Sequence, residues 1–130
     1  MGMDPNYQKN MVLVTGGTGF IGRHVCARLH DLGYMVRAAV RRGAELPSAW
    51  QQVIVGEIDA STHWDAAIEG VHSVVHLVSY SPVPQASAAE QAVAYHRINV
   101  DGSVALARAA MTAGVRRLIY LSTIKVNGEV

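Results

Sequence analysis

The sequence predicts an α/β fold, in which helices cover both faces of a parallel sheet. Five short apolar runs rich in β-branched residues alternate with segments of helical periodicity, at intervals of about 20 to 30 residues. Half of the 130 residues are apolar and 16% are charged, which is the composition of a folded domain and not of a disordered chain. Alternation of this kind produces parallel strands joined by right-handed crossovers.

The first half of the chain contains three predicted strands and one helix. Residues 11–15 form an apolar run that stops at glycines, a pattern typical of a strand buried on both faces. Residues 20–32 place apolar side chains at helical spacing, and Gly33 follows where a helix end favours a left-handed residue. Residues 35–40 and 53–55 are the next apolar runs, and we expect both to be strands.

A short helix and a fourth strand follow. Ser61 or Thr62 can cap a helix that continues through Glu69, and Gly70 would close it. Residues 73–78 are again apolar and predict the fourth strand.

The last third of the chain predicts a loop, a long helix and a fifth strand. Residues 79–87 hold two prolines and no periodic pattern, and a loop of this length is often functional. Residues 88–113 predict a long, alanine-rich helix that Gly114 ends, and residues 117–122 predict the fifth strand.

Charge and composition exclude several classes of partner. Eleven basic residues against ten acidic ones give a net charge of +1, so we expect neither a nucleic-acid partner nor a membrane surface. No apolar stretch approaches the ~18 residues of a membrane span. Cys26 is the one cysteine, which excludes an intrachain disulfide, and the six histidines show no metal spacing, so no metal site is expected. Residues 1–10 are polar and predict a disordered leader without a signal peptide.

The turn after the first strand carries the strongest chemical signal. Gly16, Gly19 and Gly22 follow a predicted strand and open a predicted helix. The first glycine permits a tight turn, the second lets a diphosphate approach the backbone, and the third lets the helix pack against the strand. Free amide groups in the helix's first turn would then face the anion. The pattern therefore favours a dinucleotide site over a mere tight turn.

Five ordered motifs resemble the extended short-chain dehydrogenase/reductases, a family of NAD(P)-dependent nucleotide-sugar epimerases and dehydratases. They span residues 11–128, and the later ones resemble the family's Gly-Asp-Leu-x-Asp, His-x-Ala-Ala, Asn-Val-x-Gly-Thr and Ser-Ser-x-x-Val-Tyr-Gly segments. In this sequence the five read Thr15-Gly-Gly-Thr-Gly-Phe-Ile-Gly22, Gly56-Glu-Ile-Asp59, His76-Leu-Val-Ser79, Asn99-Val-x-Gly102 and Leu121-Ser-Thr-Ile-Lys-Val-Asn-Gly128.

The resemblance implies a Rossmann-type sheet of strand order 3-2-1-4-5, truncated relative to the family. Residues 11–130 would be the N-terminal, NAD(P)-binding portion of a longer cytoplasmic enzyme whose C-terminal substrate domain is absent. The long helix at 88–113 implies a homo-oligomer. No tyrosine of this chain is followed four residues later by lysine, so the family's Tyr-x-x-x-Lys acid/base pair is missing and we expect the chain alone to be inactive. Asn127 also replaces the tyrosine of the family's Val-Tyr-Gly segment, which puts the usual sugar substrates in doubt.

The end of the second strand bears on the choice of cofactor. Arg41 and Arg42 stand where an acidic residue would bind the ribose 2′-hydroxyl of NAD, and the nearest acid in sequence is Glu45. A basic pair can instead bind the 2′-phosphate of NADP, so NADP is favoured over NAD. The alternative is that both arginines are solvated loop charges.

The resemblance also implies roles for residues of the later motifs. Asp59 would bind the adenine amino group while Ile58 packs on the ring, although Asp59 could equally cap the next helix. Thr123 would be the catalytic hydroxyl that hydrogen-bonds the substrate oxygen, although such residues are also common in turns. The remaining residues assigned to the cofactor site come from the glycine motif, from the end of strand four and from the long helix; they are Thr18, Phe20, Ile21, Leu77, Val78, Ser79 and Asn99.

Three functional hypotheses follow. The first is the cofactor-binding part of an epimerase, dehydratase or oxidoreductase that acts on a nucleotide-linked sugar, with the dinucleotide exchanging hydride with the substrate carbinol. The second is an NADP-dependent reductase of a non-sugar carbonyl compound. The third is a non-catalytic NADP-binding sensor or interaction module, which would need no acid/base tyrosine.

Overall fold

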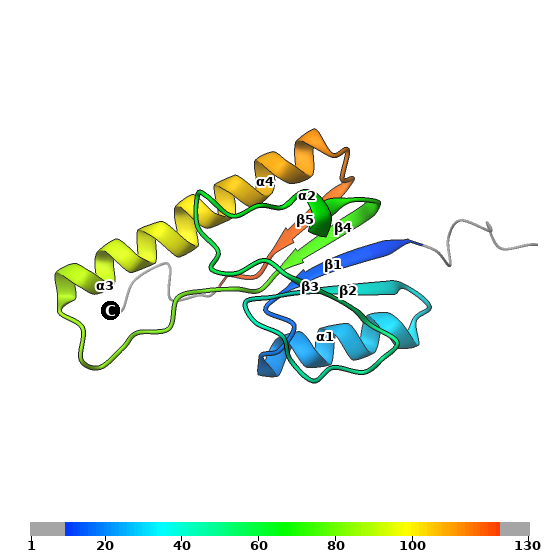
Figure 1. The fold of residues 1–130 in the computed structure, drawn as a ribbon, viewed down its shortest axis with the longest axis horizontal. Coiled ribbons are helices and arrows are strands. Elements are labelled where there is room, and N and C mark those ends of the chain that lie inside the picture. Colours follow the sequence, from blue (N-terminus) through cyan, green and yellow to red (C-terminus); the bar gives the residue numbers. More distant parts are fainter. Residues whose placement is uncertain (1–9, 123–130) are drawn as a thin grey trace, which may run out of the picture.

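The computed structural model describes residues 10–122, and these form one five-stranded parallel sheet (Figure 1). The strand order is β3-β2-β1-β4-β5, which confirms the order that the family resemblance implied. The predictions of a leader at residues 1–10 and of a catalytic Thr123 fall wholly or largely outside the described residues. The strands are β1 Met11–Thr15, β2 Met35–Val40, β3 Gln51–Ile54, β4 Val71–His76 and β5 Arg117–Tyr120.

Strand β1 lies at the centre of the sheet, and all five of its residues are buried. Its side chains alternate between two hydrophobic clusters, because successive residues of a strand point to opposite faces. Val12 and Val14 pack with Cys26 of helix α1 (Phe20–Asp31), while Met11 and Leu13 belong to the cluster on the other face. Burial on both faces explains why the strand is apolar at every position. Burial also raises the pKa of the Cys26 thiol to about 11, so this residue packs as a small hydrophobe.

The second face is covered by a short helix and a long one (Figure 1). Helix α2 (Asp65–Ile68) contributes Ala67 and Ile68 to this cluster, and helix α4 (Ser103–Thr112) contributes Leu106 and Ala110. Helices therefore lie on both faces of the sheet, as predicted. No helix within residues 10–122 combines the length and the apolar character that crossing a membrane requires.

The predicted helix at 88–113 is continuous but not α-helical throughout. It starts as α3 (Ala88–Tyr95), where Ser87 and Glu90 form a reciprocal capping box. It then widens into a π-helical segment, η2 (His96–Gly102), and resumes as α4, after which Gly114 adopts a positive φ of 78°. Such π segments recur at functional sites, and this one lies beside the cavity described below.

The predicted start of helix α2 is wrong. This helix begins after Trp64, which provides no side-chain cap, and neither Ser61 nor Thr62 caps it. Both hydroxyl groups are used in the turn before it, where Thr62 donates to the Glu57 carbonyl and Ser61 donates to the Asp59 carboxylate. The boundaries of β3, β4 and β5 differ from the predicted ones by at most two residues.

Candidate functional site

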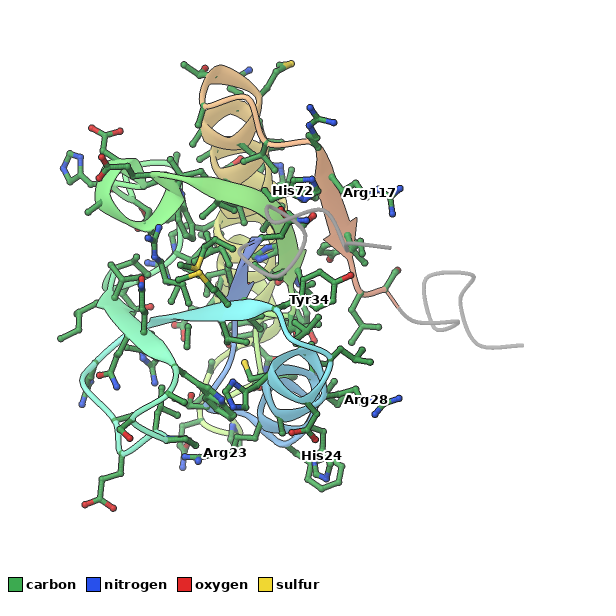
Figure 2. The ribbon with its side chains drawn as sticks, turned by 90° about the vertical axis from the view of Figure 1, so that its right-hand side faces the viewer. Arg23, His24, Arg28, Tyr34, His72 and Arg117 are labelled. Atoms are coloured by element: carbon green, nitrogen blue, oxygen red, sulfur yellow. The ribbon has the colours of Figure 1, made fainter. Side chains whose placement is uncertain are left out.

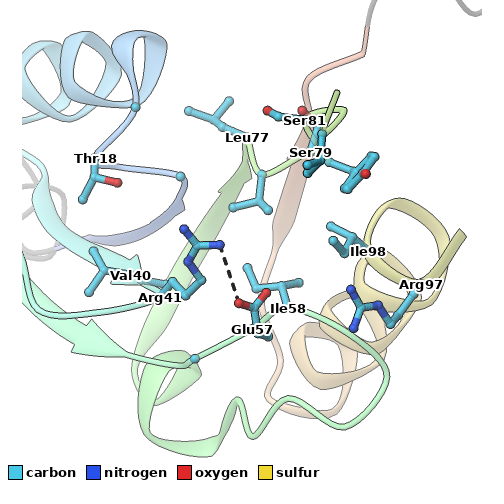
Figure 3. A pocket seen from close by; sticks show the side chains of 17 residues that line it. Thr18, Val40, Arg41, Glu57, Ile58, Leu77, Ser79, Ser81, Arg97 and Ile98 are labelled. Carbon is cyan, nitrogen blue, oxygen red and sulfur yellow. Dashed lines mark ion pairs between the residues drawn. The ribbon is translucent and has the colours of Figure 1, made fainter. Parts of the chain in front are cut away.

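A cavity of about 610 Å³ opens at the carboxyl ends of the parallel strands (Figure 3). It lies where β1 is flanked by β2 on one side and β4 on the other, so the crossovers leave in opposite directions. In open α/β sheets this switch point is where ligands bind. The cavity is lined by the glycine turn and by the ends of β2, β3, β4 and η2, through Gly16, Thr18, Gly19, Ala39, Val40, Arg41, Gly56, Glu57, Ile58, Leu77, Val78, Ser79, Tyr80, Ser81, Val83, Arg97 and Ile98.

The glycine turn has the tight geometry that its sequence predicts. Gly16 adopts a φ of +71°, which favours glycine, and its carbonyl accepts a hydrogen bond from the Gly19 amide at 3.1 Å. A Cβ on Gly22 would lie 1.9 Å from the Gly16 carbonyl oxygen. Helix α1 therefore sits against the turn at a distance that only glycine permits.

Gly19 differs from Gly16 and Gly22 because the fold would accommodate a side chain at this position. Its φ of −75° is open to any residue, and an added Cβ would meet only the Gly16 carbonyl oxygen, at 3.4 Å, which is ordinary van der Waals contact. Gly19 nevertheless lines the cavity. Because packing does not require this glycine, its position points to a ligand that approaches the backbone.

Helix α1 presents its N-terminus at the same place. Gly19 is its N-cap, no side chain caps it, and its first turn holds no acidic residue. The amide groups of that turn are thus left for an anion, which the helix dipole favours.

The side chains of Phe20 and Ile21 do not line the cavity. They are 82% and 51% exposed, and they border an apolar groove on the outer side of α1 together with Val25 and Leu29. Figure 2 shows His24 projecting outward from the same helix. Phe20 and Ile21 therefore contribute to the predicted anion site at the N-terminus of α1 only through their backbone amides.

Arg41 lines the cavity, whereas Arg42 is not among its lining residues. The Nη1 atom of Arg41 lies 3.5 Å from the Oε1 atom of Glu57, and the two side chains are 64% and 56% exposed (Figure 3). Glu57 therefore supplies an acid at the end of β2, where the sequence shows none. We did not predict it because it follows the next strand and is 16 positions away; the parallel pairing of β2 with β3 brings it there.

Ile58 is buried and lines the cavity, but Asp59 does not line it. The Asp59 carboxylate accepts hydrogen bonds from the Ser61 hydroxyl at 2.7 Å and from the Ser61 amide at 2.8 Å, and these bonds hold its pKa below the usual range. Asp59 closes a local turn, and it is not the cap of α2, which begins at Asp65. The carboxylate on the cavity wall is that of Glu57.

The end of β4 brings Leu77, Val78 and Ser79 to the cavity, and a buried polar chain holds the backbone of the first two. The Thr15 hydroxyl oxygen accepts hydrogen bonds from the Leu77 amide at 3.0 Å and from the Val78 amide at 3.4 Å. With both acceptor positions filled, that hydroxyl donates to Nδ1 of His76 at 2.6 Å.

His76 is 1% exposed and completes this chain with a 3.0 Å contact from Nε2 to the Ser103 hydroxyl. Because Nδ1 accepts, Nε2 carries the proton and donates to Ser103. Burial lowers the pKa of His76 to about 4, so the ring is neutral at pH 7. His76 is a satisfied core histidine that joins β1, β4 and α4.

The π segment contributes to the opposite wall. The Oδ1 atom of Asn99 accepts a hydrogen bond from the Tyr80 amide at 2.9 Å, so Asn99 holds the backbone of the loop after β4. Its neighbours Arg97 and Ile98 line the cavity and were not predicted. The ring of Tyr80 also packs edge-on against Tyr95, with centroids 4.8 Å apart. Within residues 10–122, no three potential metal-ligating side chains come together.

Residues 12–130 match the NAD dependent epimerase/dehydratase family. The chain belongs to this family. The match confirms the resemblance to the N-terminal part of the extended short-chain dehydrogenase/reductases.

The names of curated relatives describe several different activities. The chain is 36% identical over 119 residues to the UDP-glucose 4-epimerase of Vibrio cholerae, covering 91% of this chain and 36% of that protein. It is 32% identical over 115 residues to a 3 beta-hydroxysteroid dehydrogenase/Delta 5→4-isomerase of Mycobacterium tuberculosis, covering 86% and 31%. The chain therefore spans about a third of the length of the curated relatives that it matches.

Solved structures share the fold. A short-chain dehydrogenase/reductase superfamily protein from Agrobacterium tumefaciens with bound NAD aligns with a TM-score of 0.76 and 32% identity, covering 92% of this chain and 34% of that one. MoeE5 in complex with UDP-glucose and NAD aligns with a TM-score of 0.77 and 31% identity, covering 93% and 39%.

Proposed function

We propose that residues 11–130 are an NAD(P)-binding Rossmann domain and bind the dinucleotide in the cavity at the carboxyl ends of the strands. Gly19 carries the proposal, because a glycine that the fold does not need lies where a diphosphate would meet the free amides of α1. Ile58 offers an apolar surface to the adenine, and the segment at Leu77 and Val78 lies on the β4 side of the same cavity. The bound cofactor supplies hydride transfer.

The substrate that we propose is a nucleotide-linked sugar, handled by a longer protein of which this chain is the cofactor-binding part. Support comes from relatives and neighbours whose names include UDP-glucose 4-epimerase and a complex with UDP-glucose and NAD. A second candidate is reduction of a non-sugar carbonyl compound, which the similarity to a ketoreductase of Penicillium rubens and to a ceramide reductase of Caulobacter vibrioides favours. A cytoplasmic location and a homo-oligomeric state are further proposals from the family.

We expect the 130-residue chain by itself to show no epimerase or dehydrogenase turnover. Its sequence lacks a Tyr-x-x-x-Lys pair, so hydride transfer has no positioned group to move the accompanying proton, which costs about 10² to 10⁴ in rate. Assays of the purified chain with UDP-glucose and either NAD or NADP check this. Measurable conversion above a no-protein control would contradict it.

The cofactor that we propose is NADP, held through its adenosine 2′-phosphate by Arg41. Arg41 lines the cavity and Arg42 does not, so the two neighbouring arginines form a matched test and control. We expect Arg41→Ala to weaken NADP binding about tenfold to a hundredfold and to leave NAD nearly unchanged, because a lost charge-assisted contact costs roughly 1.5 to 3 kcal/mol.

Calorimetric titration at low salt measures both cofactors, since screening weakens exposed charge contacts. Arg42→Ala should leave both affinities close to those of the wild type. Equal weakening of NAD and NADP by Arg41→Ala would show that Arg41 does not recognise the 2′-phosphate.

A further inference from the structure

Two opposite charges, one beyond β2 and one beyond β3, lie together at one wall of the cavity. Arg41 follows β2, Glu57 follows β3, and their charged atoms are 3.5 Å apart (Figure 3). A carboxylate in this part of a dinucleotide site favours NAD, because it accepts a hydrogen bond from the ribose 2′-hydroxyl. A guanidinium favours NADP, because it pairs with the 2′-phosphate.

We infer that Glu57 sets the preference between NADP and NAD by competing with the adenosine 2′-phosphate for the Arg41 guanidinium. This inference rests on the proposed function, since it assumes that a dinucleotide occupies the cavity. To bind NADP through Arg41, the protein must exchange the carboxylate of Glu57 for the phosphate. NAD has no such phosphate and requires no exchange.

The exposure of the pair shows that this exchange is possible. Both side chains are more than half exposed, so the ion pair is screened by solvent and can separate without burying a lone charge. The freed carboxylate returns to water. Glu57 therefore lowers NADP affinity by a modest factor and does not block the cofactor.

The other charged groups near the cavity do not duplicate this role. The Asp59 carboxylate is held by Ser61 and does not line the cavity. Arg97 lines the cavity, but its charge acts on the Asp59 carboxylate, whereas the ion pair of Glu57 is with Arg41. Within residues 10–122, Glu57 is thus the carboxylate in position to compete for Arg41.

The test compares Glu57→Gln with the wild type by calorimetric titration of NADP and of NAD at low salt. Glutamine keeps the size of the side chain and removes its charge. We expect the dissociation constant of NADP to fall about two- to fivefold, the range for loss of an exposed ion pair, with no gain in NAD affinity. The ratio of the two constants is the readout, because effects on the shared diphosphate and on folding cancel in it.

Two controls isolate the competition. Glu45→Gln removes the same charge from the loop after β2, at a residue that does not line the cavity, and should leave the ratio unchanged. In an Arg41→Ala background, Glu57→Gln should no longer alter the ratio, because the guanidinium for which the carboxylate and the 2′-phosphate compete is gone.

The possible failures are distinguishable. If the wild type binds neither dinucleotide, the proposed function itself is wrong. If it binds them but Glu57→Gln leaves the ratio unchanged, the inference fails while the proposed function stands. An equal change in the presence and absence of Arg41 would also overturn it, because the carboxylate would then act on the phosphate directly.

Discussion

Gly22→Ala is expected to destabilise the protein by about 3 kcal/mol or more, although alanine is the better helix former. Helix propensity alone would favour alanine, by up to about 1 kcal/mol, at this position in the first turn of α1. Steric overlap reverses the sign, because the new Cβ would lie 1.9 Å from the carbonyl oxygen of Gly16 and 2.8 Å from Cα of Gly17. Both obstacles are backbone atoms, so no side-chain rotation relieves the overlap, and α1 must move off the turn.

Urea unfolding followed by circular dichroism measures this loss, and Gly19→Ala is the matched control. The same methyl group at Gly19 would meet only the Gly16 carbonyl oxygen, at 3.4 Å, so we expect a free energy of unfolding within about 0.5 kcal/mol of the wild-type value. Dinucleotide binding should nevertheless fall sharply, because the methyl group would stand beside the proposed diphosphate position. Wild-type stability of Gly22→Ala would show that α1 does not pack on the turn as described. Wild-type NADP binding by Gly19→Ala would remove the main support for the proposed site.

The parts of the fold that were predictable are those whose signal is local. Strand β1 is apolar at every position because both of its faces are buried, and this pattern can be read without knowing its neighbours. The helix ends at Gly33 and Gly114 could also be predicted, because a glycine after a helical pattern marks a residue with positive φ, and both residues adopt positive φ values. The glycine turn was found because its spacing encodes one backbone geometry.

The parts that were missed depend on pairing between distant segments. Glu57 reaches Arg41 only because β2 and β3 are parallel and in a particular register, which no local pattern reveals. Asp59 is also acidic and lies two positions after Glu57, but its carboxylate accepts hydrogen bonds from Ser61 and does not line the cavity.

The π segment was missed for a related reason. A π bulge in a helix has no composition signal of its own. Here it accompanies two contacts outside the helix. The Tyr80 amide donates a hydrogen bond to Oδ1 of Asn99, and Gly102 lies so close to Ile58 that an added Cβ would stand 2.9 Å from the Ile58 side chain. A lone asparagine in an apolar helix was the one available hint.

The stability of the protein is expected to fall by about 3 kcal/mol between pH 6.5 and pH 4 because of His76 alone. The pKa of this buried ring is about 4 in the folded protein, against an ordinary value of 6.5 once unfolded. Between these values the unfolded chain binds a proton that the folded protein does not, so acid favours unfolding. The difference of about 2.5 pH units, at roughly 1.4 kcal/mol each, amounts to about 3.5 kcal/mol, and most of this loss falls between pH 6.5 and pH 4.

The surroundings of His76 explain why no other group offsets this cost. Its contacts are the hydroxyl groups of Thr15 and Ser103 and, at a centroid distance of 5.7 Å, the ring of Tyr120; none of them is a carboxylate that would stabilise the cation. Protonation at Nδ1 would also break the hydrogen bond that Thr15 donates, and Thr15 holds the Leu77 amide at the cavity. Acid should therefore weaken both the sheet and the cavity wall.

Urea unfolding of the wild type and of His76→Gln at several pH values between 7.5 and 4 tests this assignment. The variant loses hydrogen bonds and will be less stable at neutral pH, so the slope of stability against pH is the informative quantity. Carboxylates titrate in both proteins, and their contribution cancels when the slopes are compared. We expect a clearly flatter slope for His76→Gln and an unchanged slope for His30→Gln, which removes an exposed histidine. Parallel slopes for the wild type and His76→Gln would mean that the His76 ring has the same pKa in the folded protein as in the unfolded chain. That result would contradict a buried, neutral His76 that links Thr15 to Ser103.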